Sequence, residues 1–133
     1  MVHADASNFA EGVTKEDAYE QVLLQAEGLL DGQRNWGKVA CQIIPFGRGV
    51  CGAAAQSQTT QLVKNVEEFP GHIACDGDSK SEIVVPILAG PDGGEKKVVA
   101  IIDVDCAVMN GFDEVDKKHL EQLAELIARS CDW

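Results

Sequence analysis

The chain has 133 residues, of which 45% are hydrophobic and 25% charged, the proportions of one globular domain rather than of a disordered chain. Eleven basic residues stand against 22 acidic ones, for a formal net charge of -11, which disfavours nucleic acid and anionic membrane surfaces as partners. No apolar run approaches the roughly 18 residues of a membrane span, and the N-terminus lacks a secretory pattern. We therefore expect a cytoplasmic protein.

The first half of the chain shows one strong helical pattern followed by weaker signals. Small polar residues without periodicity predict a flexible arm over residues 1–13. Thr14 is the expected N-cap of a helix whose apolar residues recur at three- and four-residue steps, up to an end at Asp31 and Gly32. The elements expected next are a strand at Val39–Ile44, a helix at Ala53–Ser57, a strand at Gln61–Val66 and a turn at Phe69–Gly71.

The second half predicts an antiparallel hairpin and a final helix. Glu82–Leu88 and Lys97–Asp105 are rich in β-branched residues, and Ala89–Gly94 between them has the glycines and proline of a turn. Asp113 is the expected N-cap of an amphipathic helix. With helices at both ends and antiparallel strands between them, residues 1–133 are predicted to form a single α+β domain.

A glycine-rich stretch before the predicted helix at Ala53 allows two interpretations. Gly47, Gly49 and Gly52 have the spacing of a dinucleotide-binding fingerprint. However, the downstream hairpin does not continue a parallel βαβ unit, and the first half of the chain is too short for a doubly wound sheet. We therefore expect these glycines to allow a tight, strained backbone beside Cys51.

Five cysteines stand at positions 41, 51, 75, 106 and 131. A reducing compartment disfavours a disulfide scaffold, and no two cysteines have the close spacing of zinc ligands, so we expect neither a metal centre nor a cofactor. Cys41, Cys51 and Cys75 lie near turn residues, where loops commonly carry reactive groups. Two thiols that meet could run a cycle through a sulfenic acid and a disulfide. The alternative is a small buried hydrophobic residue, which we expect for Cys131.

Three acidic residues form a second candidate group. Asp103 and Asp105 are two apart on a predicted strand, so their side chains share one face, and Glu82 begins the neighbouring strand. Carboxylates on one face repel each other unless a cation or a shared proton compensates. Such a cluster suits a substrate ammonium group, or a carboxylic acid of raised pKa that donates a proton. The alternative is a solvated strand end with ordinary pKa values.

Three segments together resemble one protein family, the free methionine-(R)-sulfoxide reductases, which are built on the GAF fold. The similar segments are a cysteine-bearing loop at Gly37–Ala55, a second signature at Pro70–Ile87, and a third at Ile101–Cys106 with Gly111–Asp113. The steps from Cys41 to Cys51 to Cys75 match the family's three-cysteine pattern. The resemblance implies a GAF-like antiparallel sheet flanked by N- and C-terminal helices.

The resemblance also implies a thiol cycle on these cysteines. Cys75 would attack the sulfur of free L-methionine-(R)-sulfoxide, leaving methionine and a sulfenic acid. Cys41 would resolve that acid as a disulfide, and thioredoxin would regenerate the dithiol. Cys51 is an auxiliary thiol and the alternative nucleophile. The implied activity is that of a thiol-dependent oxidoreductase.

The substrate would be held at both ends. The resemblance implies that Glu82, Asp103 and Asp105 hold the amino group and assist protonation of the departing oxygen, while backbone near Ile73 and Ala74 receives the carboxylate. Such a site refuses a peptide-bound residue, which lacks those charges. The expected partners are free methionine sulfoxide and thioredoxin, with no nucleic acid and no membrane. A homodimer is a candidate assembly, because GAF domains often pair.

The resemblance breaks between Trp36 and Gly37. Family members carry several dozen residues there, including two strands and an aromatic segment, so this sheet is expected to lack two strands and to expose an edge. The pocket would also lack aromatic walls around the sulfoxide methyl group. We expect the residues that carry the chemistry to be present and the activity to be impaired. The alternative is a GAF-like module, or an inactive isoform, that binds a small ligand without turnover.

Overall fold

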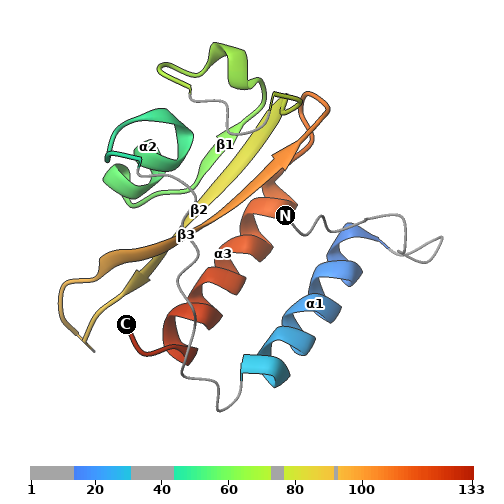
Figure 1. Ribbon diagram of the computed structural model, residues 1–133. Coiled ribbons are helices and arrows are strands. Elements are labelled where there is room, and N and C mark those ends of the chain that lie inside the picture. The colour runs from blue at the N-terminus through green and yellow to red at the C-terminus, as the bar shows by residue number, and fades with distance from the viewer. Residues whose placement is uncertain (1–13, 31–43, 73–76, 92) are drawn as a thin grey trace.

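The computed structural model describes residues 14–30, 44–72, 77–91 and 93–133 (Figure 1). The elements are α1 (Lys15–Leu30), α2 (Gly49–Ser57), β1 (Gln61–Val63), a 3-10 turn (Val66–Glu68), β2 (Ser81–Ala89), β3 (Lys97–Cys106) and α3 (Glu114–Ser130). Helices combine with an antiparallel sheet, which confirms the predicted α+β class.

The sheet of the described residues has the strand order β1-β2-β3 and is antiparallel throughout. β2 and β3 form the predicted hairpin, with Ser81 opposite Cys106 and a bulge between Ile87 and Leu88. The segment that follows the glycine-rich stretch is therefore not a parallel βαβ unit, and the dinucleotide interpretation loses its structural context. β1 and β3 are the outer strands of this sheet.

The central strand β2 is buried on both faces from Ser81 to Ile87. Side chains of a strand alternate between faces, so Ile83 and Val85 pack with α3 whereas Val84 packs with α2. Figure 1 shows the resulting layers, with α2 on one side of the sheet and α3 and α1 on the other. The Glu82 side chain lies on the same face of β2 as that of Val84, so it also points toward α2.

Both terminal helices begin where the sequence predicts. Thr14 Oγ1 accepts a hydrogen bond from the backbone N–H of Asp17 at 3.1 Å. Asp113 caps α3 by accepting from the backbone N–H groups of Val115 and Asp116, and Asp116 accepts in return from the N–H of Asp113. These reciprocal bonds satisfy N–H groups that have no partner within a helix.

The two terminal helices are held together by polar contacts at their N-terminal halves. Lys15 Nζ lies 2.6 Å from Asp116 Oδ2, and the Tyr19 hydroxyl donates to Asp116 Oδ1 at 2.9 Å. The Tyr19 ring also stacks on the His119 ring, with a centroid separation of 5.0 Å. The cap of α3 is thus also the docking point for α1.

Two boundaries differ from the predictions. The expected strand at Gln61–Val66 ends at Val63, because Asn65 accepts from the N–H of Glu67 and starts a 3-10 turn instead. The expected helix at Ala53–Ser57 begins four residues earlier, at Gly49, within the glycine-rich stretch.

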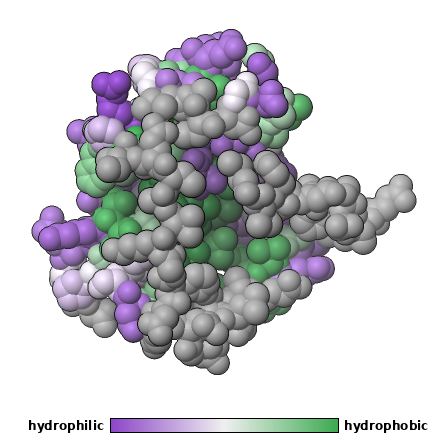
Figure 2. All heavy atoms as spheres, viewed as in Figure 1, coloured by the Kyte–Doolittle hydropathy of each residue, from purple (hydrophilic) through white to green (hydrophobic). Residues whose placement is uncertain are grey.

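Other expected features lie outside the described residues. They are the arm over residues 1–13, the helix end at residues 31 and 32, and the strand at 39–44 except for Ile44, which is not in a strand. No helix within the described part of the chain is long and apolar enough to cross a membrane. On the face in Figure 2, hydrophobic side chains gather across the middle and hydrophilic ones lie around the rim.

Candidate active site

The three predicted acids come together on the face of the sheet that α2 covers. The strand register places Glu82 directly opposite Asp105, and Asp103 opposite Val84. Because alternate residues share a face, all three carboxyl groups project toward α2. The prediction that Glu82 lies beside the two aspartates is confirmed.

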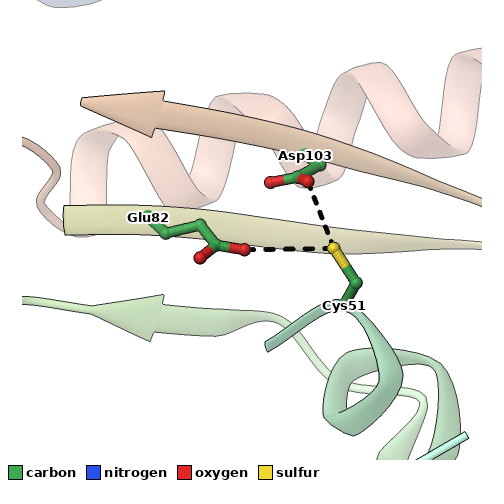
Figure 3. Close-up of side chains that lie close together, drawn as sticks. All are labelled: Cys51, Glu82 and Asp103. Atoms are coloured by element: carbon green, nitrogen blue, oxygen red, sulfur yellow. Dashed lines mark hydrogen bonds between the residues drawn. The ribbon is translucent and has the colours of Figure 1, made fainter. Parts of the chain in front are cut away.

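Cys51 reaches this cluster from the first turn of α2. The backbone before it takes left-handed conformations at Gly47 (φ 80°) and Gly49 (φ 61°), which residues with a Cβ rarely adopt. This confirms the tight backbone predicted beside Cys51. The side chain is buried, with 9% of the residue exposed, and points between two carboxyl groups (Figure 3). Its Sγ donates to Asp103 Oδ2 at 3.1 Å and lies 3.9 Å from Glu82 Oε1.

Gly52 fixes the loop that carries Cys51. Its carbonyl accepts from the N–H of Gly47 at 2.8 Å, and a Cβ at Gly52 would lie 2.5 Å from the carbonyl oxygen of Pro45. Gly52→Ala is therefore expected to force the backbone apart and to lower the free energy of unfolding by about 2 kcal/mol. Denaturant unfolding checks this. Gly77→Ala is the control, because a Cβ there meets nothing within 4 Å; equal losses in both variants would contradict the packing argument.

The acid cluster has shifted protonation equilibria. Burial, followed by repulsion from Asp103 and Asp105, raises the pKa of Glu82 to about 8. Burial also raises the pKa of Asp103, against the opposing effect of the hydrogen bond from Cys51. A carboxyl group with a pKa near 8 keeps its proton at neutral pH and can donate it to a departing oxygen.

His72 is a site residue that the sequence analysis did not single out. Its Nδ1 lies 4.0 Å from Glu82 Oε2, is closed to solvent, and has no hydrogen-bond partner among the described residues. Together with Arg48, it lines the same small cavity as Cys51 and the acids, with a volume of about 10 Å³, room for roughly one water. The only sequence signal for His72 was its place three residues before Cys75.

The remaining predicted site residues and the other two cysteines divide into two groups. Cys75, Cys41, Ile73 and Ala74 lie outside the described residues. Cys131, expected to be a buried hydrophobic residue, is buried with 8% exposed, and Cys106 at the end of β3 is half-buried. The described part of the site thus comprises one thiol, one imidazole and three carboxyl groups, with Arg48 at the same cavity.

Comparisons with known proteins agree on one protein family. A GAF domain model matches residues 7–131. The free methionine-R-sulfoxide reductase of Saccharomyces cerevisiae is 43% identical, with 97% of this chain and 94% of the relative covered. A solved structure described as a GAF domain has a TM-score of 0.84 at 40% identity, covering 95% of this chain and 94% of the other. The free methionine-R-sulfoxide reductase from Neisseria meningitidis, solved with its substrate, has a TM-score of 0.77 at 28% identity, with coverages of 92% and 93%.

The alignment with the yeast relative also bears on the internal break. It spans 173 positions, more than the 133 residues of this chain, so at least 40 positions of the alignment have no counterpart here. This number agrees with the several dozen residues expected to be absent. The location of the break between Trp36 and Gly37 stays a prediction, because both residues lie outside the described part of the chain.

Proposed function

We propose that this chain, which belongs to the GAF domain family and within it to the free methionine-R-sulfoxide reductases, reduces the R epimer of free methionine sulfoxide to methionine. The observation that carries the proposal is the contact of a buried thiol with two carboxyl groups of raised pKa, Glu82 and Asp103. That arrangement offers both a thiol and a proton donor beside one cavity.

The proposed reaction uses two thiols for each sulfoxide. The Cys75 thiolate attacks the sulfoxide sulfur, the oxygen takes up a proton, and methionine leaves while Cys75 becomes a sulfenic acid. Cys41 then attacks the sulfenic acid, forming a disulfide and releasing water. The dithiol of thioredoxin reduces that disulfide and is itself oxidised. Cys51 is the alternative first nucleophile.

The acids supply both recognition and a proton. Asp103 and Asp105 attract the substrate ammonium group, and Glu82, protonated near neutral pH, donates to the departing oxygen. In this proposal the substrate carboxylate is received by backbone amides near Ile73 and Ala74. A peptide-bound methionine sulfoxide lacks both end charges and leaves Asp103 and Asp105 without a cationic partner, so it is rejected.

Asp103→Asn is expected to raise KM for free methionine sulfoxide by about tenfold or more, because a hydrogen bond to a charged group contributes about 1.5–3 kcal/mol. Steady-state kinetics with thioredoxin as the reductant measure this. Glu95→Gln removes a carboxylate from the exposed hairpin turn and serves as the control, with kinetics expected to match those of the unmodified protein. An unchanged KM in the Asp103 variant would remove that residue from the binding site.

The direct test of the function uses fully reduced protein. Adding free L-methionine-(R)-sulfoxide should release one methionine per chain and remove two free thiols, with a Cys41–Cys75 link in the peptide map. The S epimer and an N-acetylated sulfoxide should do neither. Adding thioredoxin with its reductase should then give continuous turnover, which a reducing cytoplasm would sustain.

A second candidate function is a GAF module that binds a small ligand without turnover. It is favoured by the absence of at least 40 positions that the yeast relative has. If the thiols stay unchanged and circular dichroism shows a folded chain, this second function is the better one. We also propose a homodimer as the assembly, and a strictly monomeric species in sedimentation would contradict it.

A further inference from the structure

The thiol and two of the acids are spaced like metal ligands. Cys51 Sγ, a Glu82 carboxylate oxygen and an Asp103 carboxylate oxygen all lie within 4.8 Å of one another. The sulfur is 3.1 Å from Asp103 Oδ2 and 3.9 Å from Glu82 Oε1. Three different elements, α2, β2 and β3, supply these atoms, as Figure 3 shows.

These distances fit a tetrahedral zinc ion. Zinc binds thiolate sulfur at about 2.3 Å and carboxylate oxygen at about 2.0–2.2 Å, so a tetrahedral angle separates sulfur from oxygen by about 3.6 Å. The two observed sulfur–oxygen distances lie on either side of that value. The spacing of the sulfur and the two oxygens is therefore close to that of ligands around one zinc ion.

His72 lies next to these three ligand residues and lines the same cavity. Its Nδ1 is closed to solvent, has no hydrogen-bond partner within the described part of the chain, and lies 4.0 Å from Glu82 Oε2. A buried ring nitrogen without a partner is unfavourable unless something bound in the cavity satisfies it. A thiolate ligand beside two carboxylates, with an imidazole close by, favours zinc over magnesium or calcium.

A cation would also suit the cluster when its carboxyl groups are ionised. Glu82, Asp103 and Asp105 face one another across the hairpin. Within the described residues, His72 is the only basic side chain that lies within ion-pair distance of any of them. A divalent cation at this point would offset the repulsion between the carboxylates.

We propose that Cys51, Glu82 and Asp103 form a site for a soft divalent cation, zinc in particular, with His72 beside it. Sequence spacing gave no sign of it, because the three ligands come from separate segments. The site shares Glu82 and Asp103 with the proposed ammonium site, so the metal would compete with free methionine sulfoxide; this competition, unlike the metal site itself, rests on the proposed function.

Cadmium titration of the reduced, metal-free full chain tests the site. One cadmium per chain should bind with the ultraviolet charge-transfer band of a cadmium–thiolate bond, and zinc should abolish the band by displacement. Cys51→Ser should lose the band, and Glu82→Gln should weaken cadmium binding by about tenfold or more. Cys106→Ser, at a half-buried thiol outside the cluster, is the control and should bind as the unmodified chain does.

Two results with these variants would contradict the proposed metal site. A band that survives in Cys51→Ser and disappears in Cys75→Ser would overturn the proposal, as would unchanged cadmium affinity in the folded Glu82→Gln protein. Circular dichroism of each variant shows whether it is folded. Adding free methionine sulfoxide should reduce the cadmium band. If it does not, while the predicted ligands hold the metal, the metal site stands and the proposed substrate site is wrong.

Discussion

Replacement of Cys75 by serine is expected to abolish the reduction of free methionine-(R)-sulfoxide, lowering turnover by about a thousandfold or more. A serine hydroxyl is not ionised at neutral pH and does not form the sulfenic acid on which the cycle depends. Methionine release measured by chromatography, both in a single turnover and with thioredoxin, checks this. Cys106→Ser should keep the activity of the unmodified chain, because Cys106 lies outside the acid cluster.

The other two loop cysteines separate the attacking from the resolving thiol. Cys41→Ser should still release about one methionine per chain and then stop, because a sulfenic acid forms but no partner thiol converts it into the expected disulfide. If Cys51→Ser loses the first turnover while Cys75→Ser keeps it, Cys51 is the nucleophile. Its buried position against Asp103 makes that alternative worth testing beside the first.

The stability of the fold is expected to fall as the pH rises from about 5 to about 8. The pKa of Glu82 is about 8 in the folded chain and 4.5 without the fold. Between these values the folded state holds a proton that the unfolded state has lost, so raising the pH favours unfolding. The pKa difference corresponds to at most about 5 kcal/mol of unfolding free energy. We expect the free energy of unfolding to fall by an amount on the order of 2 kcal/mol or more over this pH range. The raised pKa of Asp103 acts in the same direction.

Denaturant unfolding at a series of pH values measures this effect, and Glu82→Gln is the matched variant. Glutamine has nearly the shape of protonated Glu82 and no charge to bury, so the variant should equal the unmodified chain at pH 5 and exceed its stability at pH 8. Glu16 and Asp113, whose carboxyl groups have lowered pKa values, change stability only at pH values below this range. An equal pH dependence in both proteins would show that Glu82 ionises normally.

The local features of the fold could be predicted because they depend on neighbouring residues. Asp113 and Thr14 mark the starts of helices through hydrogen bonds to backbone N–H groups two or three residues away. The turn residues between two β-branched runs predicted the β2–β3 hairpin, which the structure confirms. The predicted end of β1 at Val66 was wrong, because the strand pattern there competes with a local hydrogen bond. Asn65 caps a 3-10 turn, and β1 ends before it at Val63.

The sequence by itself determined the α+β class, the shared face of Asp103 and Asp105, and the resemblance to a reductase family. Only the tertiary structure brought Cys51 against Glu82 and Asp103, which are 31 and 52 residues away, and turned His72 toward the same cavity. The packing of α2 on the sheet decides these contacts, and no local period encodes it. The raised pKa of Glu82 is likewise a tertiary property, because burial and facing charges, and not its sequence neighbours, set it.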